Sequence, residues 1–311
     1  MRKRTCLTAL TAIAMLACVL PATPSRADTS EPNRPLVFAH YMTCFTLSVE
    51  FCKHEIRIAQ AHGLDGFAMD FGEWCKWDAK AGALKPTRYV QNMDNMFQAA
   101  KELGTGFQLL LTPEWSIQPV EKNVMHMVKR YHDHPNVMRH EGKMALSSYG
   151  PGASYGPVLD KLAAEGYELF FVPYTGRGRH EMSYSVEGAL QILSSHPRID
   201  GMWKFAADDS PRGILLANAN ARRAAIFADK LYMAGVAPHY ASANTRDFRG
   251  FGGYAAVWNG IVRDRPEWVE IVTWNDYNED TNLMHYKWKR GLLKPLYDRD
   301  GSFLDFTAYC I

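Results

Sequence analysis

The sequence has few cysteines and no strong excess of charge of either sign. Six cysteines occur in 311 residues, and 35 Lys and Arg oppose 33 Asp and Glu. No Cys-x-x-Cys pair is present, which argues against a structural zinc site. No Gly-x-Gly-x-x-Gly follows a predicted strand, which argues against a doubly wound dinucleotide-binding sheet. No cofactor is expected. The near-neutral balance gives no reason to expect a nucleic acid or an acidic membrane as partner.

Long apolar runs are absent except at the amino terminus. There, a basic start precedes the apolar run Thr5–Leu20, and Ser25-Arg26-Ala27 places small residues where a signal peptidase cuts. The run is short for a membrane span, which needs about 20 residues. The pattern predicts a signal peptide over residues 1–27, a flexible lead-in over 28–35 and a soluble protein that is secreted or periplasmic. A lipoprotein cleavage site at Cys18 is the alternative.

Removing the predicted leader changes both the charge and the cysteine count. The leader carries four basic residues and no acidic ones, so 31 basic residues remain against 33 acidic ones. Four cysteines also remain, which is an even number in an oxidising compartment, and disulfides are therefore expected. Three pairings stay open among Cys44, Cys52, Cys75 and Cys310.

Short β-rich apolar runs alternate with helical patterns after residue 35. The predicted strands are Leu36–Met42, Leu64–Phe71, Gly106–Thr112, Met144–Ser148, Glu168–Tyr174, Asp200–Phe205, Gly235–Tyr240 and Trp268–Trp274. The predicted helices between them are Val49–His62, Arg88–Leu103, Val120–His132, Gly156–Glu165, Ser185–Ser195, Asn218–Met233 and Gly252–Arg263. This alternation predicts parallel strand pairing, because each helix returns the chain to the same end of the sheet.

The number of these units predicts a single (β/α)8 TIM-type barrel over residues 36–311. Eight strand–helix units suit one barrel of this length. The run Phe107–Leu111 is apolar at nearly every position, as expected for a strand covered on both faces. A doubly wound open sheet is the structural alternative.

Acidic and aromatic side chains dominate the carboxyl ends of the predicted strands, where barrel enzymes place their active sites. Aromatic faces stack on sugar rings, and carboxylates transfer protons in a desolvated cleft. The candidate substrate-binding residues are therefore His40, Tyr41, Asp70, Trp74, Glu114, Trp115, Tyr174, His239, Trp274, Asn275 and Tyr277.

The eighth strand ends in the most informative motif, Thr-Trp-Asn-Asp-Tyr-Asn-Glu over residues 273–279. It places two carboxylates, Asp276 and Glu279, three residues apart where the chain leaves the barrel. Such groups can lie roughly 6–10 Å apart, which includes the spacing that inverting glycosidases need for a water molecule. Asp276 and Glu279 are the predicted catalytic acid and base, with Glu279 as the preferred acid. A purely structural role as loop or helix caps is the alternative.

Two segments carry a resemblance to a known family: residues 228–239, Ala-Asp-Lys-Leu-Tyr-Met-Ala-Gly-Val-Ala-Pro-His, and residues 266–279, which include the motif above. With residues 37–42, 58–68 and 134–147, they resemble glycoside hydrolase family 71, the α-1,3-glucanases or mutanases. The similarity spans most of residues 36–285.

The resemblance implies a (β/α)8 catalytic domain, inversion without a metal, and an α-glucan substrate cut by Asp276 and Glu279. The chain departs from the family pattern at several strand ends. Asn278-Glu279-Asp280 replaces the usual Gly-Glu-Ser, and Asp70 stands where members often have Asn. The exact linkage therefore stays open.

Two other functions remain open at this point. A barrel that binds glycans without cutting them would keep the aromatic cleft. A metal-dependent barrel hydrolase would need clustered histidines at strand ends, and only His40 and His239 stand there. The interpretation favoured here is an exported, metal-independent glycosidase that acts on α-glucan, most simply as a monomer.

Overall fold

A computed structural model of the chain describes residues 34–45, 47–114, 116–150, 155–174, 185–205, 210–238, 250–279, 281–289, 292–295 and 302–311. These residues belong to one compact unit, Arg34–Ile311. The predicted signal peptide and residues 28–33 of the lead-in lie outside the described residues. In the part of the chain that is described, no helix is both long and apolar enough to span a membrane.

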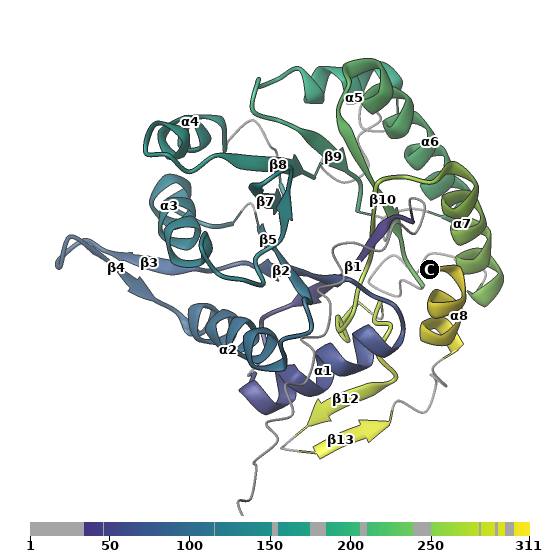
Figure 1. The fold of residues 1–311 in the computed structure, drawn as a ribbon, viewed down its shortest axis with the longest axis horizontal. Helices are drawn as coiled ribbons and strands as arrows, with labels where there is room; N and C mark the ends of the chain where they lie inside the picture. Colours follow the sequence, from purple (N-terminus) through teal and green to yellow (C-terminus); the bar gives the residue numbers. More distant parts are fainter. Residues whose placement is uncertain are drawn as a thin grey trace, which may run out of the picture. The chain divides into compact units, whose positions relative to one another are not determined.

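Eight parallel strands in the described part form the barrel (Figure 1). Neighbouring strands pair in the order β1-β2-β5-β7-β8 on one side and β1-β11-β10-β9 on the other. A parallel bridge between Tyr174 and Trp203 joins the ends of β8 and β9 and closes the ring. The strands are β1 (Leu36–Met42), β2 (Gly66–Phe71), β5 (Gln108–Pro113), β7 (Lys143–Ser148), β8 (Leu169–Pro173), β9 (Gly201–Trp203), β10 (Leu231–Val236) and β11 (Trp268–Ile271).

Helices cover the outside of this barrel (Figure 1). Side-chain caps define where several of them begin, since Ser48, Thr87 and Ser185 each accept a hydrogen bond from a backbone N–H of the first helical turn. The helices are α1 (Val49–Ala61), α2 (Arg88–Leu103), α3 (Val120–Tyr131), α4 (Gly156–Ala164), α5 (Val186–Leu193), α6 (Pro211–Ala228), α7 (Gly250–Asp264) and α8 (Ser302–Cys310). The predicted (β/α)8 fold is confirmed.

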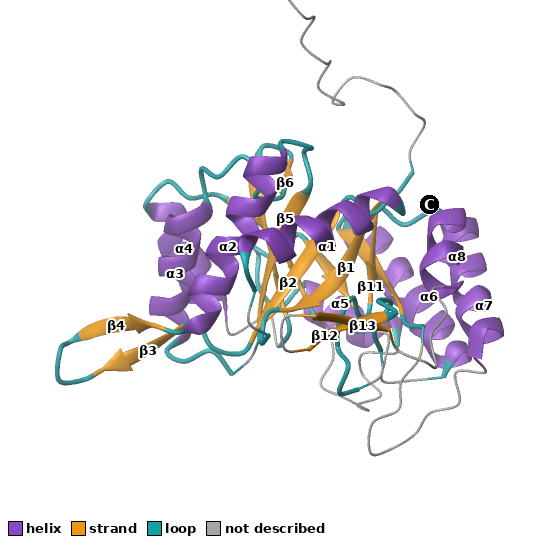
Figure 2. Ribbon diagram, turned by 90° about the horizontal axis from the view of Figure 1, so that it is seen from below, coloured by secondary structure: helices purple, strands orange, loops and turns teal. Residues whose placement is uncertain are grey.

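Additional short strands were not predicted from the sequence. The hairpin β3 (Cys75–Asp78) and β4 (Ala83–Pro86) projects away from the barrel between β2 and α2 (Figures 1 and 2). A second antiparallel hairpin pairs β12 (Tyr286–Lys289) with β13 (Leu292–Pro295), and β6 (Arg139–His140) pairs with the start of β7.

The sixth helix and the seventh barrel strand lie earlier than predicted. A helix over Asn218–Met233 and a strand over Gly235–Tyr240 were expected, but α6 ends at Ala228 and β10 begins at Leu231. Asp229 stops the helix because it adopts a left-handed backbone conformation, with φ of 54°. The apolar run Leu231-Tyr-Met continues the helical pattern in sequence, which hides this boundary.

Side chains alternate between the barrel interior and the helix layer, as the period of two in a strand requires. Phe38 and Trp268 point inward, and their rings lie 6.1 Å apart between centroids. Trp268 also contacts Phe170 at 5.8 Å and His140 at 5.3 Å. These aromatic rings fill the amino-terminal end of the barrel, so the open end is the one where the strands finish.

The expected disulfides are absent from the structure, and that prediction is corrected. All four cysteines of the described part carry free thiols. Cys52 is buried within helix α1, and Cys75 is buried at the start of β3, so packing and not pairing satisfies these two side chains. Cys44 and Cys310, which follow β1 and end α8, are half-buried.

Candidate active site

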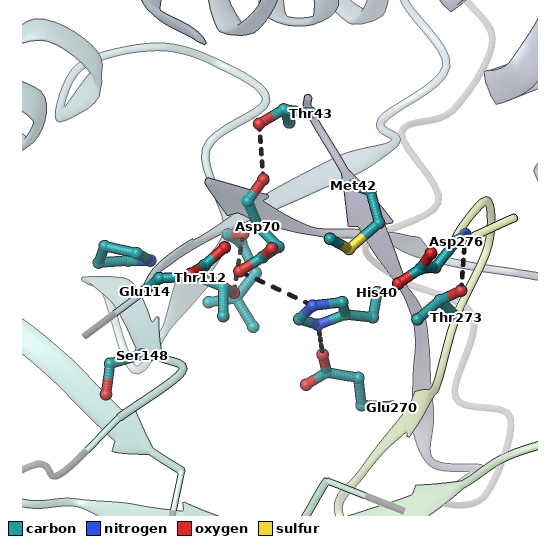
Figure 3. Close-up of polar contacts among 12 residues, drawn as sticks. His40, Met42, Thr43, Asp70, Thr112, Glu114, Ser148, Glu270, Thr273 and Asp276 are labelled. Carbon is teal, nitrogen blue, oxygen red and sulfur yellow. Dashed lines mark hydrogen bonds and ion pairs between the residues drawn. The ribbon is translucent and has the colours of Figure 1, made fainter. Parts of the chain in front are cut away.

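Carboxylates from neighbouring strands meet at the carboxyl end of the barrel. Asp70 on β2 pairs in register with Met42 on β1 and with Thr112 on β5. Glu114 follows β5, and its backbone forms a parallel β-bridge with the backbone of Tyr149, which follows β7. The alternation of each strand turns Asp70 and Glu114 toward the same interior, and Figure 3 shows them side by side.

His40 lies at the centre of this group, between two buried carboxylates. Its Nδ1 is 2.6 Å from Glu270 Oε1, and its Nε2 is 3.8 Å from Asp70 Oδ1 (Figure 3). Burial alone would lower the pKa of His40. Hydrogen bonding and the charges of Asp70 and Glu270 outweigh burial and raise this pKa to about 10. This direction favours the imidazolium form of His40.

Glu114 is able to hold a proton near neutral pH. Burial, followed by the negative charge of Asp70, raises the pKa of Glu114 to about 7. Ser116 Oγ lies 3.3 Å from Glu114 Oε2. Gly72 leaves the space for this carboxyl group, because a Cβ there would lie 3.1 Å from Glu114 Oε1.

The two predicted catalytic residues occupy the loop that follows β11. Asp276 is buried, and its Oδ1 accepts hydrogen bonds from the backbone N–H groups of Asn278 at 2.9 Å and Glu279 at 3.2 Å. Thr273 Oγ1 accepts the N–H of Asp276 at 2.9 Å (Figure 3). Glu279 is half-buried. Burial and the charge of Asp276 raise the pKa of Glu279, while His40 lowers it. The loop thus places two carboxyl groups in different surroundings.

Aromatic rings form the other wall around His40. The ring of Phe205 lies 5.5 Å from that of His40, Trp203 lies 5.9 Å away and Tyr149 lies 6.3 Å away. The predicted Tyr174 belongs to this wall, since it stacks on Tyr149 with centroids 5.1 Å apart and planes 15° apart. Such a wall beside carboxylates suits a sugar ring, which needs both an apolar face and hydrogen-bonding partners.

Several predicted binding residues lie elsewhere. Tyr41 and Trp274 are fully buried and both pack on Phe67, on the helix side of the strands. Trp74 is buried where the β3–β4 hairpin leaves β2, and its Nε1 donates to His126 Nδ1 at 2.9 Å. These three side chains are not brought to the carboxylate cluster.

The remaining predicted residues are loop anchors or lie outside the described residues. Asn275 accepts the N–H of Met42 at 2.8 Å and donates to its carbonyl at 3.2 Å, so it fastens the loop to β1. The half-buried Tyr277 lies 5.7 Å from Phe45 between ring centroids. Trp115 and His239 are not described.

Glu55 on helix α1 supports this loop from behind the barrel. It is fully buried, and its Oε2 accepts the indole N–H of Trp274 at 2.5 Å, two residues before Asp276. Burial raises the pKa of Glu55 to about 7, although the bond from Trp274 lowers it. Ionising Glu55 therefore opposes folding as pH rises from about 4.5 to about 7.

The variant Glu55→Gln is expected to remove this pH dependence. The amide oxygen still accepts from Trp274 but cannot ionise. The free energy of unfolding of the variant, relative to the unmodified chain, should thus improve by about 3 kcal/mol between pH 4 and pH 8. Urea unfolding at both pH values measures this. Glu50→Gln, on the exposed face of α1, is the control, and a stability difference independent of pH for Glu55→Gln would contradict the account.

Glu270 and two rings of the aromatic wall, Trp203 and Phe205, were missed by reasoning from the sequence. Glu270 stands inside the apolar run Trp268-Val-Glu-Ile, and a charge within such a run is the signal that could have revealed it. Tyr149 and Tyr174 both stood at predicted strand ends, but only the fold shows that their rings stack. Among the described residues, no group of three or more His, Cys, Asp or Glu side chains is arranged to hold a metal ion.

Comparison with solved structures agrees with this architecture. The GH99 endo-α-mannosidase of Bacteroides thetaiotaomicron superposes with a TM-score of 0.65 and 16% identity, covering 88% of this chain and 95% of that one. The endo-β-1,4-mannanase of Thermotoga petrophila superposes with a TM-score of 0.55 and 9% identity, covering 90% of this chain and 77% of that one. At this identity the likeness concerns the fold alone, which is the (β/α)8 barrel also used by these two glycosidases.

Sequence comparison then gives the family. The family model of glycosyl hydrolase family 71 matches residues 33–294. The chain belongs to glycosyl hydrolase family 71. It is 25% identical over 262 residues to the glucan endo-1,3-α-glucosidase agn1 of Schizosaccharomyces pombe, covering 78% of this chain and 57% of that protein.

Two further curated relatives carry related names. The ascus wall endo-1,3-α-glucanase of Schizosaccharomyces pombe is 25% identical over 285 residues, covering 82% of this chain and 58% of its own length. The mutanase Pc12g07500 of Penicillium rubens is 25% identical over 321 residues, covering 91% of this chain and 66% of that protein. The chain thus spans about three fifths of the length of the curated relatives it matches.

Proposed function

We propose that the chain hydrolyses α-1,3-glucosidic bonds in glucan with inversion, using Asp276 and Glu279 and no metal. The observation that carries the proposal is the different surroundings of these two carboxyl groups in one loop at the open end of the barrel. The names of the curated relatives supply the substrate class. The apolar leader and its small-residue exit support export to the periplasm or the medium.

The surroundings of Asp276 and Glu279 suggest how the roles divide. Asp276 accepts two backbone N–H groups with one oxygen, which holds its carboxyl group in one place in the loop. It is the proposed base that deprotonates the attacking water. The raised pKa of Glu279 favours its protonated form, so Glu279 is the proposed acid that protonates the departing oxygen.

Substrate contacts follow from the same geometry. Asp70, Glu114 and His40 line the acidic side of the proposed sugar pocket, and Tyr149 and Tyr174 line the aromatic side. Acceptors for sugar hydroxyls thus face a surface on which a ring can stack.

The test is to incubate the purified protein with α-1,3-glucan, α-1,4-glucan and β-1,3-glucan and to measure new reducing ends. Release from α-1,3-glucan alone or predominantly is expected. Binding of oligosaccharides without new reducing ends would replace the hydrolase with a glycan-binding barrel. Release from β-1,3-glucan only would contradict the proposed linkage.

A further inference from the structure

The contact between His40 and Glu270 joins two side chains that are almost wholly removed from solvent. His40 is 2% exposed, and Glu270 is 0% exposed. Their atoms approach to 2.6 Å, which is the length of a charge-assisted hydrogen bond. Glu270 lies in β11 and pairs in register with Phe38 of β1. Phe38 precedes His40 by two residues on the same face of β1, so the Glu270 side chain reaches the ring from inside the barrel.

Removing such groups from water is unfavourable unless they are paired. Asp70, 3% exposed, is the second carboxylate at the ring, on the opposite nitrogen. Within the described residues, Asp70 Oδ1 and Glu270 Oε2 are buried and have no hydrogen-bond partner. Burial raises the pKa of Glu270, while the hydrogen bond and the charge of His40 lower it. Two acidic side chains with unfilled acceptor sites therefore depend on one ring.

A neutral imidazole ring could not satisfy both carboxylates. It has one N–H, whereas the imidazolium form has two and can donate to Glu270 from Nδ1 and toward Asp70 from Nε2. The groups around the ring come from five places: Asp70 on β2, Glu114 after β5, Tyr149 after β7, Trp203 and Phe205 on and after β9, and Glu270 and Glu279 on and after β11. Lys204, also after β9, lies against the Tyr174 hydroxyl at 3.4 Å.

We propose that Glu270 is a positioning residue that keeps His40 doubly protonated, and that the imidazolium in turn fixes the Asp70 carboxylate at the edge of the sugar pocket. Glu270 contacts Nδ1 of the ring, whereas Asp70 faces Nε2 on the opposite side, so in this proposal Glu270 acts on the pocket only through His40. The effect on catalysis rests on the proposed function, whereas the charge of His40 can be measured without any substrate.

The first test is an NMR titration of His40 in the intact protein. In the unmodified chain, the ring should stay protonated through pH 8, and a midpoint near the ordinary histidine value of about 6.5 overturns the proposal. In Glu270→Gln, loss of one carboxylate should lower the midpoint by about 1–3 pH units. Glu270→Asp keeps the charge and should keep the ring protonated at pH 8. Glu267→Gln, exposed on the same segment, is the matched control and should change nothing.

The second test is the pH dependence of glucan hydrolysis. Glu270→Gln should lower kcat by about a hundredfold and KM much less, because Asp70 is displaced from its working position. Its remaining kcat should fall further on the alkaline side, with the same midpoint as the NMR titration of His40 in that variant. Glu270→Asp should recover most of the rate. A purely structural Glu270 predicts no such coincidence, and a Glu270→Gln profile parallel to the unmodified one overturns the proposal.

The two tests separate this inference from the proposed function. An unmodified chain that hydrolyses none of the glucans overturns the proposed function, while the NMR titration still decides whether Glu270 holds the charge on His40. Because the titration of the unmodified chain needs no substitution, it measures the charge of His40 even where Glu270→Gln fails to fold.

Discussion

Replacing Asp276 with Asn or Glu279 with Gln is expected to lower kcat on α-1,3-glucan by about 10²–10⁴-fold. The reason is that general acid–base assistance contributes about that factor, and an amide neither accepts nor delivers a proton at neutral pH. The Asp276→Asn oxygen can still accept the backbone N–H groups of Asn278 and Glu279, so the loop should keep its shape. Initial rates of reducing-end release, with thermal unfolding of each variant, measure this.

The matched control for this prediction is Asn278→Ala. Asn278 is exposed in the same loop and uses its backbone N–H, which alanine retains, to bond Asp276. Its kcat should stay close to that of the unmodified chain. Near-normal hydrolysis by either amide variant would remove Asp276 or Glu279 from the mechanism and leave the capping role that the sequence also allowed.

Replacing Asn275 with Ala is expected to lower both stability and turnover. The strand β11 ends at Ile271, and beyond it the Asn275 amide pairs with the peptide of Met42 as a neighbouring strand would. Alanine leaves that N–H and carbonyl without their partner. Each such part-buried group costs up to about 1–3 kcal/mol, so the free energy of unfolding should fall by about 2–6 kcal/mol.

Turnover should fall with it, because Asp276 is the next residue in the chain. Urea unfolding and initial rates, both measured at a temperature where the variant is folded, separate the two effects. Asn278→Ala again serves as the control, with little change in either quantity. An unfolding midpoint for Asn275→Ala equal to that of the unmodified chain would show that the two bonds to Met42 do not hold the loop.

Most of the fold was predictable because short apolar runs mark the barrel strands and helical periodicity marks the segments between them. Leu36–Met42 and Arg88–Leu103 have the predicted boundaries, since turn residues and the Thr87 cap mark them. The boundary between α6 and β10 was not predictable, because the helix ends at the left-handed backbone conformation of Asp229 and no glycine marks the place. The β3–β4 hairpin was missed because its strands are short and largely exposed.

The candidate site was predictable at strand ends but not in detail. His40 and Tyr41 were both expected to contact substrate, yet adjacent strand residues point to opposite faces. The structure turns His40 inward and Tyr41 toward helix α1, where its pKa is raised by burial and by Glu55. Asp70 and Glu114 do meet, because they end neighbouring strands on the same face. The pairing of His40 with Glu270 joins residues 230 positions apart, which no local pattern encodes.

The direct test of the central claim is to follow α-1,3-glucan oligosaccharide hydrolysis by real-time proton NMR. Two carboxyl groups that activate a water molecule and protonate the departing oxygen should produce β-anomeric reducing ends first, followed by slow mutarotation. Initial formation of the α-anomer would contradict inversion by Asp276 and Glu279. A spectrum without new reducing-end signals would contradict hydrolysis itself.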